Sequence, residues 1–153
     1  MKNPNFNEAF GDVFTNTHGV IMHGCNTRGY MGAGVAALVR NKFPKAYQSY
    51  RDLCDSCFSR QELLLGRVQF IRVSDTLIIA NAFTQVDPGP CAEASAIKQA
   101  LTSVMCFASG KSFDVHSVQI GCGIGGLEWD DIAKIYNDVA GSYPNTNVTA
   151  WEY

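Results

Sequence analysis

Hydrophobic and polar residues follow two alternating periodicities along this chain, one typical of β-strands and one typical of helices. The apolar runs of strand length are Gly19–Cys25, Val68–Val73, Leu77–Phe83, Val115–Ile120 and Asn147–Trp151, with a shorter run before Gly11. The longer helical patterns are Ala33–Lys42, Lys45–Cys57, Ala92–Ala108 and Trp129–Ala140. Pro44 separates the first two helices, because proline disfavours helical geometry in the residue before it.

This alternation predicts an α/β fold with three layers, α/β/α, in which a central mixed sheet carries helices on both faces. The 153 residues contain no repeat, linker or low-complexity stretch, so we expect one domain over residues 1–153. Ligands of open α/β sheets bind at the carboxyl ends of the strands. Functional residues are therefore expected in the loops that directly follow the predicted strands.

Composition and charge narrow the range of partners. The formal net charge is −2, so no basic field predicts direct binding of nucleic acid, although backbone N–H groups can bind phosphate without Lys or Arg. No apolar run has the length of a membrane span, and the first residues lack the apolar core of a signal peptide. Six cysteines without a secretion signal indicate reduced thiols. Together these features predict a cytoplasmic protein without a membrane partner.

Metal and redox sites have little support in the sequence. His18, His23 and His116 are too scattered to propose a metal site. Cys54 and Cys57 form a C-x-x-C pair on a predicted helix, but no second pair at metal-ligand spacing accompanies it. We therefore interpret these two thiols as inert and expect neither a metal nor another cofactor.

Two glycine-rich loops share one construction, since each follows a predicted strand and precedes a predicted helix. The first runs from Asn26 to Gly34 and the second from Gly121 to Leu127. Glycine permits positive φ and close approach of the backbone to a ligand. A helix N-terminus after such a loop presents unpaired N–H groups and partial positive charge, which suit a phosphate. We expect the loops to enclose a diphosphate from both sides; the alternative is that the glycines only form tight turns.

The second loop also matches the dinucleotide pattern G-x-G-x-x-G through Gly121, Gly123 and Gly126. Its context argues against an NAD-binding Rossmann domain. Only 27 residues follow Gly126, and they hold one predicted helix and one predicted strand, which is too little for the second half of that fold. A P-loop of the form G-x-x-x-x-G-K-[ST] is absent.

The order of four motifs resembles the macrodomain family. These motifs are Gly11-Asp12-Val13-Phe14, Ile21 to Asn26, Met31 to Ala36, and Ile120 to Leu127. The chain is most similar to the branch that holds the yeast-type and phage-type ADP-ribose-1″-phosphate phosphatases and the terminal ADP-ribose protein glycohydrolase. The resemblance implies a macrodomain fold over nearly the whole chain. It also implies a small-molecule ligand, ADP-ribose or a derivative.

The resemblance assigns roles to individual residues. It implies that Asp12 accepts a hydrogen bond from the adenine amino group, although without the family an aspartate here is interpreted as a turn or capping residue. It implies that Asn26 binds the distal ribose hydroxyls. Trp151 and Tyr153 on the last strand are candidates for a wall of the adenine site, although aromatic residues of a strand more often belong to the core. The implied ligand-binding set is Asp12, Val13, Asn26, Gly32, Ala33, Gly34, Val35, Gly121, Cys122, Gly123, Ile124, Gly125, Gly126 and Leu127.

The residues available for catalysis differ from those of the glycohydrolases in this branch, which use a lysine and a second-loop aspartate. The segment Leu77–Pro90 contains no lysine, and Gly125 stands where the aspartate would be. The phosphatase-like members carry a histidine at the position of His23. An imidazole with a near-neutral pKa can act as acid, base or nucleophile. The sequence therefore favours a phosphatase over a glycohydrolase.

We accordingly predict hydrolysis of ADP-ribose-1″-phosphate to ADP-ribose and phosphate, with His23 as the catalytic residue. The structural alternative for His23 is a strand histidine satisfied by a neighbouring group. Cys122 is interpreted as a packing residue rather than a nucleophile activated by a helix N-terminus, and Asp87 as a turn residue. The alternative functions are a non-catalytic module that reads or sequesters ADP-ribose-type ligands and a hydrolase that removes ADP-ribose or an acyl group.

Overall fold

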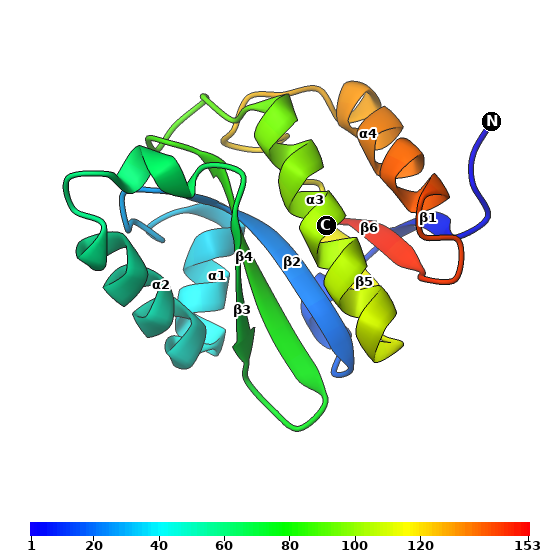
Figure 1. The fold of residues 1–153 in the computed structure, drawn as a ribbon, viewed down its shortest axis with the longest axis horizontal. Helices are drawn as coiled ribbons and strands as arrows, with labels where there is room; N and C mark the ends of the chain where they lie inside the picture. Colours follow the sequence, from blue (N-terminus) through cyan, green and yellow to red (C-terminus); the bar gives the residue numbers. More distant parts are fainter.

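The computed structural model describes residues 1–153 as a six-stranded sheet with four α-helices (Figure 1). The strands are β1 (Phe6–Phe10), β2 (Gly19–Asn26), β3 (Val68–Arg72), β4 (Leu77–Gln85), β5 (Val115–Val118) and β6 (Val148–Glu152). The α-helices are α1 (Gly34–Lys42), α2 (Pro44–Ser56), α3 (Ala94–Lys111) and α4 (Trp129–Gly141). Two short 3-10 helices, Val13–Thr15 and Gln61–Leu64, follow β1 and α2. None of the α-helices combines the length and the apolar character that a membrane span requires.

The predicted α/β fold with a mixed central sheet is confirmed, and the differences from the sequence prediction concern the ends of elements. β5 stops at Val118, two residues before its predicted end, because the chain turns there into the second glycine loop. α3 continues to Lys111 instead of ending at Ala108. Ser112 ends this helix in the left-handed conformation, with φ of 57°.

The strand order β1-β6-β5-β2-β4-β3 gathers the carboxyl ends of five strands at one edge of the sheet. β1, β6, β5, β2 and β4 pair in parallel, whereas β3 runs antiparallel to β4 at the outer edge. Parallel strands need a crossover connection, so the loops that leave β2, β4 and β5 emerge together at this edge. The nearly continuous apolar run of β4 follows from burial on both faces of the sheet.

Two hydrophobic cores join the helices to the sheet. On one face, α3 and α4 pack against the strands around Leu101 and Tyr136 (Figure 1). On the other face, α1 and α2 bury Val39 and Tyr50 against β2 and β4. The main contacts of α1 and α2 with the sheet are to β2, β3 and β4, so these helices cover one half of that face. The ends of β2 and β4 therefore lie on a platform that is packed from both sides.

Candidate functional site

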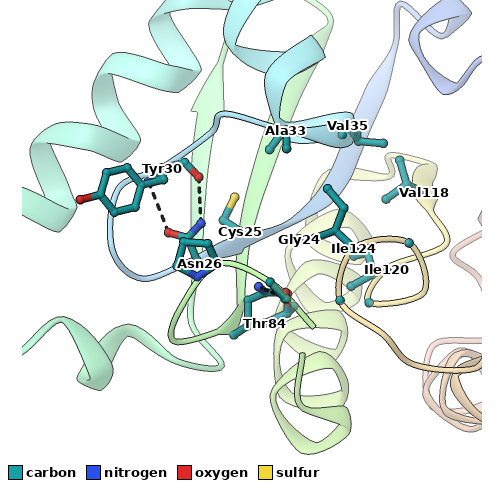
Figure 2. Close-up of a pocket in the computed structure, with 18 of the residues that line it drawn as sticks. Gly24, Cys25, Asn26, Tyr30, Ala33, Val35, Thr84, Val118, Ile120 and Ile124 are labelled. Atoms are coloured by element: carbon teal, nitrogen blue, oxygen red, sulfur yellow. Dashed lines mark hydrogen bonds between the residues drawn. The ribbon is translucent and has the colours of Figure 1, made fainter. Parts of the chain in front are cut away.

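A cavity of about 360 Å³ opens at the carboxyl edge of the sheet, between the loops that follow β2, β4 and β5 (Figure 2). We call it the loop cavity; its lining comprises residues 24–26, 30, 32–36, 84–85, 88–89, 118–121 and 123–125. A second cavity of about 310 Å³, the edge cavity, is bordered by the end of β6 and the segment after β1. The two cavities share Val35, Val118, Gln119 and Gly123 and so lie side by side; we call the pair the groove. Each volume is within the range of small-molecule sites.

The first glycine loop presents a row of free N–H groups along the loop cavity. α1 begins at Gly34, whose φ of +60° lies in the left-handed region, directly after the extended residue Ala33. The N–H groups of residues 32–36 donate no hydrogen bond within the protein, because the first turn of a helix lacks intrahelical acceptors. These groups and the helix dipole favour an anion at this position.

The second glycine loop supplies another set of free N–H groups. Gly121 and Gly126 have φ of +79° and +83°, and the N–H of Leu127 donates to the carbonyl oxygen of Gly121 at 2.8 Å. Between these turns, the N–H groups of residues 123–125 have no hydrogen-bond partner in the protein. The two loops therefore place unpaired donors along the same cavity.

The N-terminus of α4 takes no part in this cavity, contrary to expectation. The lining ends at Gly125, whereas Gly126 and Leu127 border neither cavity, so the ligand contacts predicted for these two residues find no support in the geometry. The first turn of α4 carries Asp130 and Asp131, whose negative charges already complement the helix dipole. The second loop thus offers donors from its own turn and not from the helix behind it.

Ile124 brings the two loops into close approach. The Cδ1 atom of Ile124 lies 3.2 Å from the position that a Cβ atom on Gly34 would occupy. Figure 2 shows Ile124 on the side of the second loop that faces the first loop and Val35. The free N–H groups of residues 32–36 and 123–125 thus belong to two loops that approach each other at Gly34 and Ile124.

Asn26 holds the first loop in its conformation. Its Oδ1 atom accepts hydrogen bonds from the Tyr50 hydroxyl at 2.9 Å and from the N–H groups of Arg28 and Tyr30 at 3.0 and 3.3 Å. Its Nδ2 atom donates to the carbonyl oxygen of Tyr30 at 2.8 Å (Figure 2). One N–H of the amide remains without a partner. Because Oδ1 already accepts hydrogen bonds within the protein, Asn26 can offer a ribose hydroxyl only this one N–H donor.

The loop cavity contains no charged side chain. None of its lining residues is Asp, Glu, His, Lys or Arg, so any attraction for an anion comes from the backbone. Outside the lining, Arg28 Nε donates to Asp87 Oδ1 at 2.8 Å and Arg28 Nη1 donates to Gln61 Oε1 at 3.2 Å. The hydrogen bond to Asp87 raises the pKa of the Arg28 guanidinium. No group of three or more His, Cys, Asp or Glu side chains gathers where it could hold a metal ion.

The edge cavity, at the other end of the groove, is bordered by Gly11, Val13 and Trp151. Asp12 stands between the first two in the chain but does not itself line the cavity. Asp12 caps the 3-10 helix after β1, since one carboxylate oxygen accepts from the N–H of Phe14 at 2.8 Å. Its second oxygen makes no hydrogen bond in the protein, so capping and recognition of a ligand amine are compatible. The Trp151 ring lies 3.4 Å from the position of a Cβ atom on Gly11, whose φ is +133°. Trp151 and Tyr153 both line this cavity.

His23 lies outside both cavities, which argues against its predicted catalytic role. The side chain is fully buried, and Nε2 donates to Asn81 Oδ1 at 2.6 Å. Asn81 in turn donates to the carbonyl oxygen of Ala46 in α2, so the pair is part of the protein interior. Burial lowers the pKa of His23 to about 4, and the imidazole is therefore neutral at pH 7. The structural alternative, a strand histidine satisfied by a neighbour, describes what is observed.

The cysteines that border the groove are not activated. Cys25 lines the loop cavity, but it is almost fully buried, and burial raises the pKa of its thiol well above the usual range. Cys122 lines the edge cavity, where burial and, to a lesser extent, Glu128 raise its pKa to about 11. The six cysteines are all free, including Cys54 and Cys57. The interpretation of Cys122 as a packing residue agrees with this environment.

Most of the predicted contacts meet in the groove. The loop cavity gathers Asn26, Gly32, Ala33, Gly34, Val35, Gly121, Gly123, Ile124 and Gly125, and the edge cavity gathers Val13, Val35, Cys122 and Gly123. The lining also includes residues that were not predicted from the sequence: Thr84 and Gln85 at the end of β4, and Pro88 and Gly89 in the loop after it. The available signal was the rule that strand carboxyl ends share one edge, since β4 was predicted and its following loop was rich in proline and glycine.

Comparison with known proteins supports this description of the fold. A protein of unknown function from Bacteroides thetaiotaomicron has a TM-score of 0.85 and 27% identity, covering 97% of this chain and 98% of that chain. DarTG of Thermosipho africanus, solved in complex with ADP-ribose, has a TM-score of 0.78 and 21% identity over 95% of this chain and 41% of its own.

A curated relative with a name for its activity is ADP-ribose 1″-phosphate phosphatase of Debaryomyces hansenii, which is 36% identical over 72 residues. That match covers 43% of this chain and only 40% of the length of the yeast protein. A sequence profile of the Macro domain matches residues 22–136, most of the chain and both glycine loops. Together with the α/β architecture and the paired loops at the sheet edge, this match establishes that the chain belongs to the Macro domain family.

Proposed function

We propose that this chain binds ADP-ribose or a close derivative in the groove formed by the two cavities. The observation that carries the proposal is the pair of unpaired N–H rows, residues 32–36 and 123–125, on a cavity without charged side chains. A diphosphate supplies several acceptor oxygens and negative charge to such donors. The ADP-ribose complex of the structurally similar DarTG supports the choice of ligand.

The groove gives each part of the ligand a distinct place in this proposal. The adenine occupies the edge cavity, where the free oxygen of Asp12 accepts from its amino group and Trp151 and Tyr153 form an apolar wall. The diphosphate lies between the two loops near Ile124. The distal ribose occupies the loop cavity, where Asn26 offers its remaining amide N–H.

We also propose that the substrate is ADP-ribose-1″-phosphate and that the chain hydrolyses it to ADP-ribose and inorganic phosphate. The name of the yeast relative supports this reaction. Water attacks the phosphorus, the bond between phosphorus and the 1″ oxygen breaks, and the 1″ oxygen receives a proton that comes from the water through a phosphate oxygen. The loops contribute orientation and N–H groups toward the developing charge. His23 is assigned no part in this step.

A second candidate function is a non-catalytic module that binds ADP-ribose-type ligands. It is favoured by the absence of Asp, Glu, His and Lys from the lining of the loop cavity and by the burial of His23. A side chain that transfers a proton normally accelerates such a reaction by about two to four orders of magnitude. A chain without one is expected to be either a slow phosphatase or a binder.

Titration calorimetry with ADP-ribose tests the binding proposal through Gly123→Val. Gly123 has no positive φ, and a Cβ atom there meets nothing within 4 Å, so valine fits the backbone and fills the space assigned to the diphosphate. We expect affinity to fall at least about tenfold, the cost of overpacking a filled site. Gly110→Val is the matched control, because Gly110 also faces open space but lies in α3.

The outcomes separate the two proposals. Folded wild-type protein that fails to bind ADP-ribose at millimolar concentration refutes the binding proposal. Equal affinity of Gly123→Val and Gly110→Val refutes the placement of the diphosphate. Release of inorganic phosphate from ADP-ribose-1″-phosphate is measured on the same preparations. If the wild-type protein binds the ligand but releases no more phosphate than Gly123→Val does, the chain is a non-catalytic binding module.

A further inference from the structure

Arg28 is the one basic residue in the three segments that form the loop cavity. The segments are residues 26–36, 84–93 and 118–128, and they contain no other Lys, Arg or His. Asn26 fixes the backbone of Arg28 by accepting from its N–H at 3.0 Å. About one third of the Arg28 side chain is exposed to solvent. Arg28 does not line the loop cavity, but Asn26 and Tyr30, two residues before and after it in the same loop, do.

The guanidinium of Arg28 retains unused hydrogen-bond donors. Its Nε–H donates to Asp87 and one Nη1–H donates to Gln61, while the remaining three N–H groups have no partner in the protein. A guanidinium presents these donors in a planar fork that matches the oxygens of a phosphate monoester. The residue can therefore keep its present partners while it binds an additional anion.

The position of Arg28 corresponds to one end of the groove. Asp87, which pairs with Arg28, belongs to the segment after β4, and its neighbours Gln85 and Pro88 line the loop cavity. None of this segment lines the edge cavity, which lies beyond the shared residues at the opposite end of the groove. In the proposed placement, with the adenine in the edge cavity, the distal ribose lies at the end of the groove bordered by Gln85 and Pro88, which flank the Asp87 partner of Arg28.

We propose that Arg28 is a specificity-determining residue for a terminal phosphate on the distal ribose, and that Asp87 weakens this preference by pairing with it. The proposal rests on the proposed binding of ADP-ribose in the groove. A phosphate monoester carries close to two negative charges at neutral pH, whereas the unmodified distal ribose carries none. Arg28 therefore distinguishes ADP-ribose-1″-phosphate from ADP-ribose, which the neutral lining of the loop cavity does not.

Asp87 makes the proposal testable in both directions. The paired side chains have no net charge, whereas Arg28→Gln leaves one negative charge and Asp87→Asn leaves one positive charge. The carboxylate of Asp87 bonds only to Arg28, and the bonds that hold the loop are made by the Asp87 carbonyl oxygen, which accepts from Gln85 Nε2 at 2.7 Å. Both substitutions therefore change charge without removing a backbone contact.

The experiment measures the dissociation constants of ADP-ribose and ADP-ribose-1″-phosphate by calorimetry for wild type and variants. Arg28→Gln is expected to weaken binding of the phosphorylated ligand about tenfold, and Asp87→Asn to strengthen it about threefold, as for a partly exposed charge-assisted contact. Arg28→Lys retains the charge and should retain most of the preference. ADP-ribose itself should bind all variants within about twofold, because it places no charge near this pair.

The matched control is Arg72→Gln, which removes the same charge at the opposite edge of the sheet, where Arg72 pairs with Ile78 near the start of β4. It should leave both dissociation constants unchanged. If Arg28→Gln weakens both ligands equally, or neither, Arg28 does not determine specificity and the inference is refuted while ADP-ribose binding stands. If wild-type protein binds neither ligand, both the inference and the proposed function are refuted.

Discussion

Acidification is predicted to destabilise this fold through His23. The imidazole is fully buried, and burial lowers its pKa from the ordinary value of 6.5 to about 4. Between these two pH values the unfolded chain binds a proton at His23 that the folded chain excludes. The contribution of His23 to the free energy of unfolding is therefore fully present above pH 6.5 and is lost as the pH falls toward 4.

The size of this effect follows from the difference between the two pKa values. One pKa unit corresponds to about 1.4 kcal/mol, so the complete loss is roughly 3 kcal/mol. Between pH 7 and pH 5, where most folds of this size remain stable, the loss is about 2 kcal/mol. This is a large part of the stability of an ordinary domain, which is on the order of 10 kcal/mol.

Urea unfolding followed by circular dichroism at a series of pH values measures this loss, and His23→Gln isolates it. The variant keeps a polar group near Asn81 but binds no proton. Between pH 7 and pH 5, its free energy of unfolding should therefore decrease by about 2 kcal/mol less than that of the wild type. Other titrating groups, carboxylates included, are unchanged and cancel in the comparison. His116→Gln serves as a comparison: partial burial also lowers the pKa of His116, while the Asp114 charge opposes the shift, so this variant should change the pH dependence of stability less than His23→Gln does.

Two results would refute the reasoning. Parallel stability profiles of wild type and His23→Gln would show that the imidazole is not a neutral buried group. Loss of ligand binding or phosphate release in a folded His23→Gln protein at pH 7 would return His23 to the functional site. We expect binding and turnover to be unchanged at that pH, since His23 borders neither cavity.

Two further predictions concern single positions of the second loop. Gly121→Ala should lower stability by about 2 kcal/mol, because φ is +79° and a Cβ atom would lie 2.9 Å from Ile97 Cδ1. A thermal melt checks this, and Gly110→Ala, at an exposed position of α3, should instead raise Tm. Cys122 should react slowly with iodoacetamide at pH 7, because a pKa of about 11 leaves only about one thiol in ten thousand ionised. Mass spectrometry of the labelled protein checks this against the exposed Cys91, and equal labelling of the two would contradict it.

The fold was predictable because its elements carry strong local signals. The strand before the first glycine loop is apolar from Val20 to Met22, and Pro44 marks the boundary between α1 and α2. The ends of elements were less accurate, since they depend on tertiary contacts. β5 ends at Val118 because Gly121 turns the chain away from the sheet, which no periodicity of the strand reveals.

The parts of the candidate site that backbone groups form could be predicted from the sequence. The burial of individual side chains could not. Gly34 and Gly121 were found from their positions after strands, and their positive φ explains why glycine is needed there. The depth of His23 was not predictable, because a motif position does not tell where along the strand a cavity begins. His23 and Cys25 project to the same face of β2, yet only Cys25 lines the loop cavity, while the imidazole of His23 is buried beside Asn81.

β1 and β6 pair at the edge of the sheet although they come from opposite ends of the chain, and the edge cavity depends on this pairing. Phe6 lies opposite Val148 in the sheet, although nearly the whole sequence separates them. The edge cavity needs both strands, because Gly11 follows β1 and Trp151 belongs to β6. Contacts between such distant segments carry a large loop-closure entropy and form slowly. The edge cavity therefore exists only when both ends of the chain have joined the sheet. In the proposed binding mode, a nucleotide in that cavity stabilises only the fully assembled sheet and opposes the separation of β1 from β6.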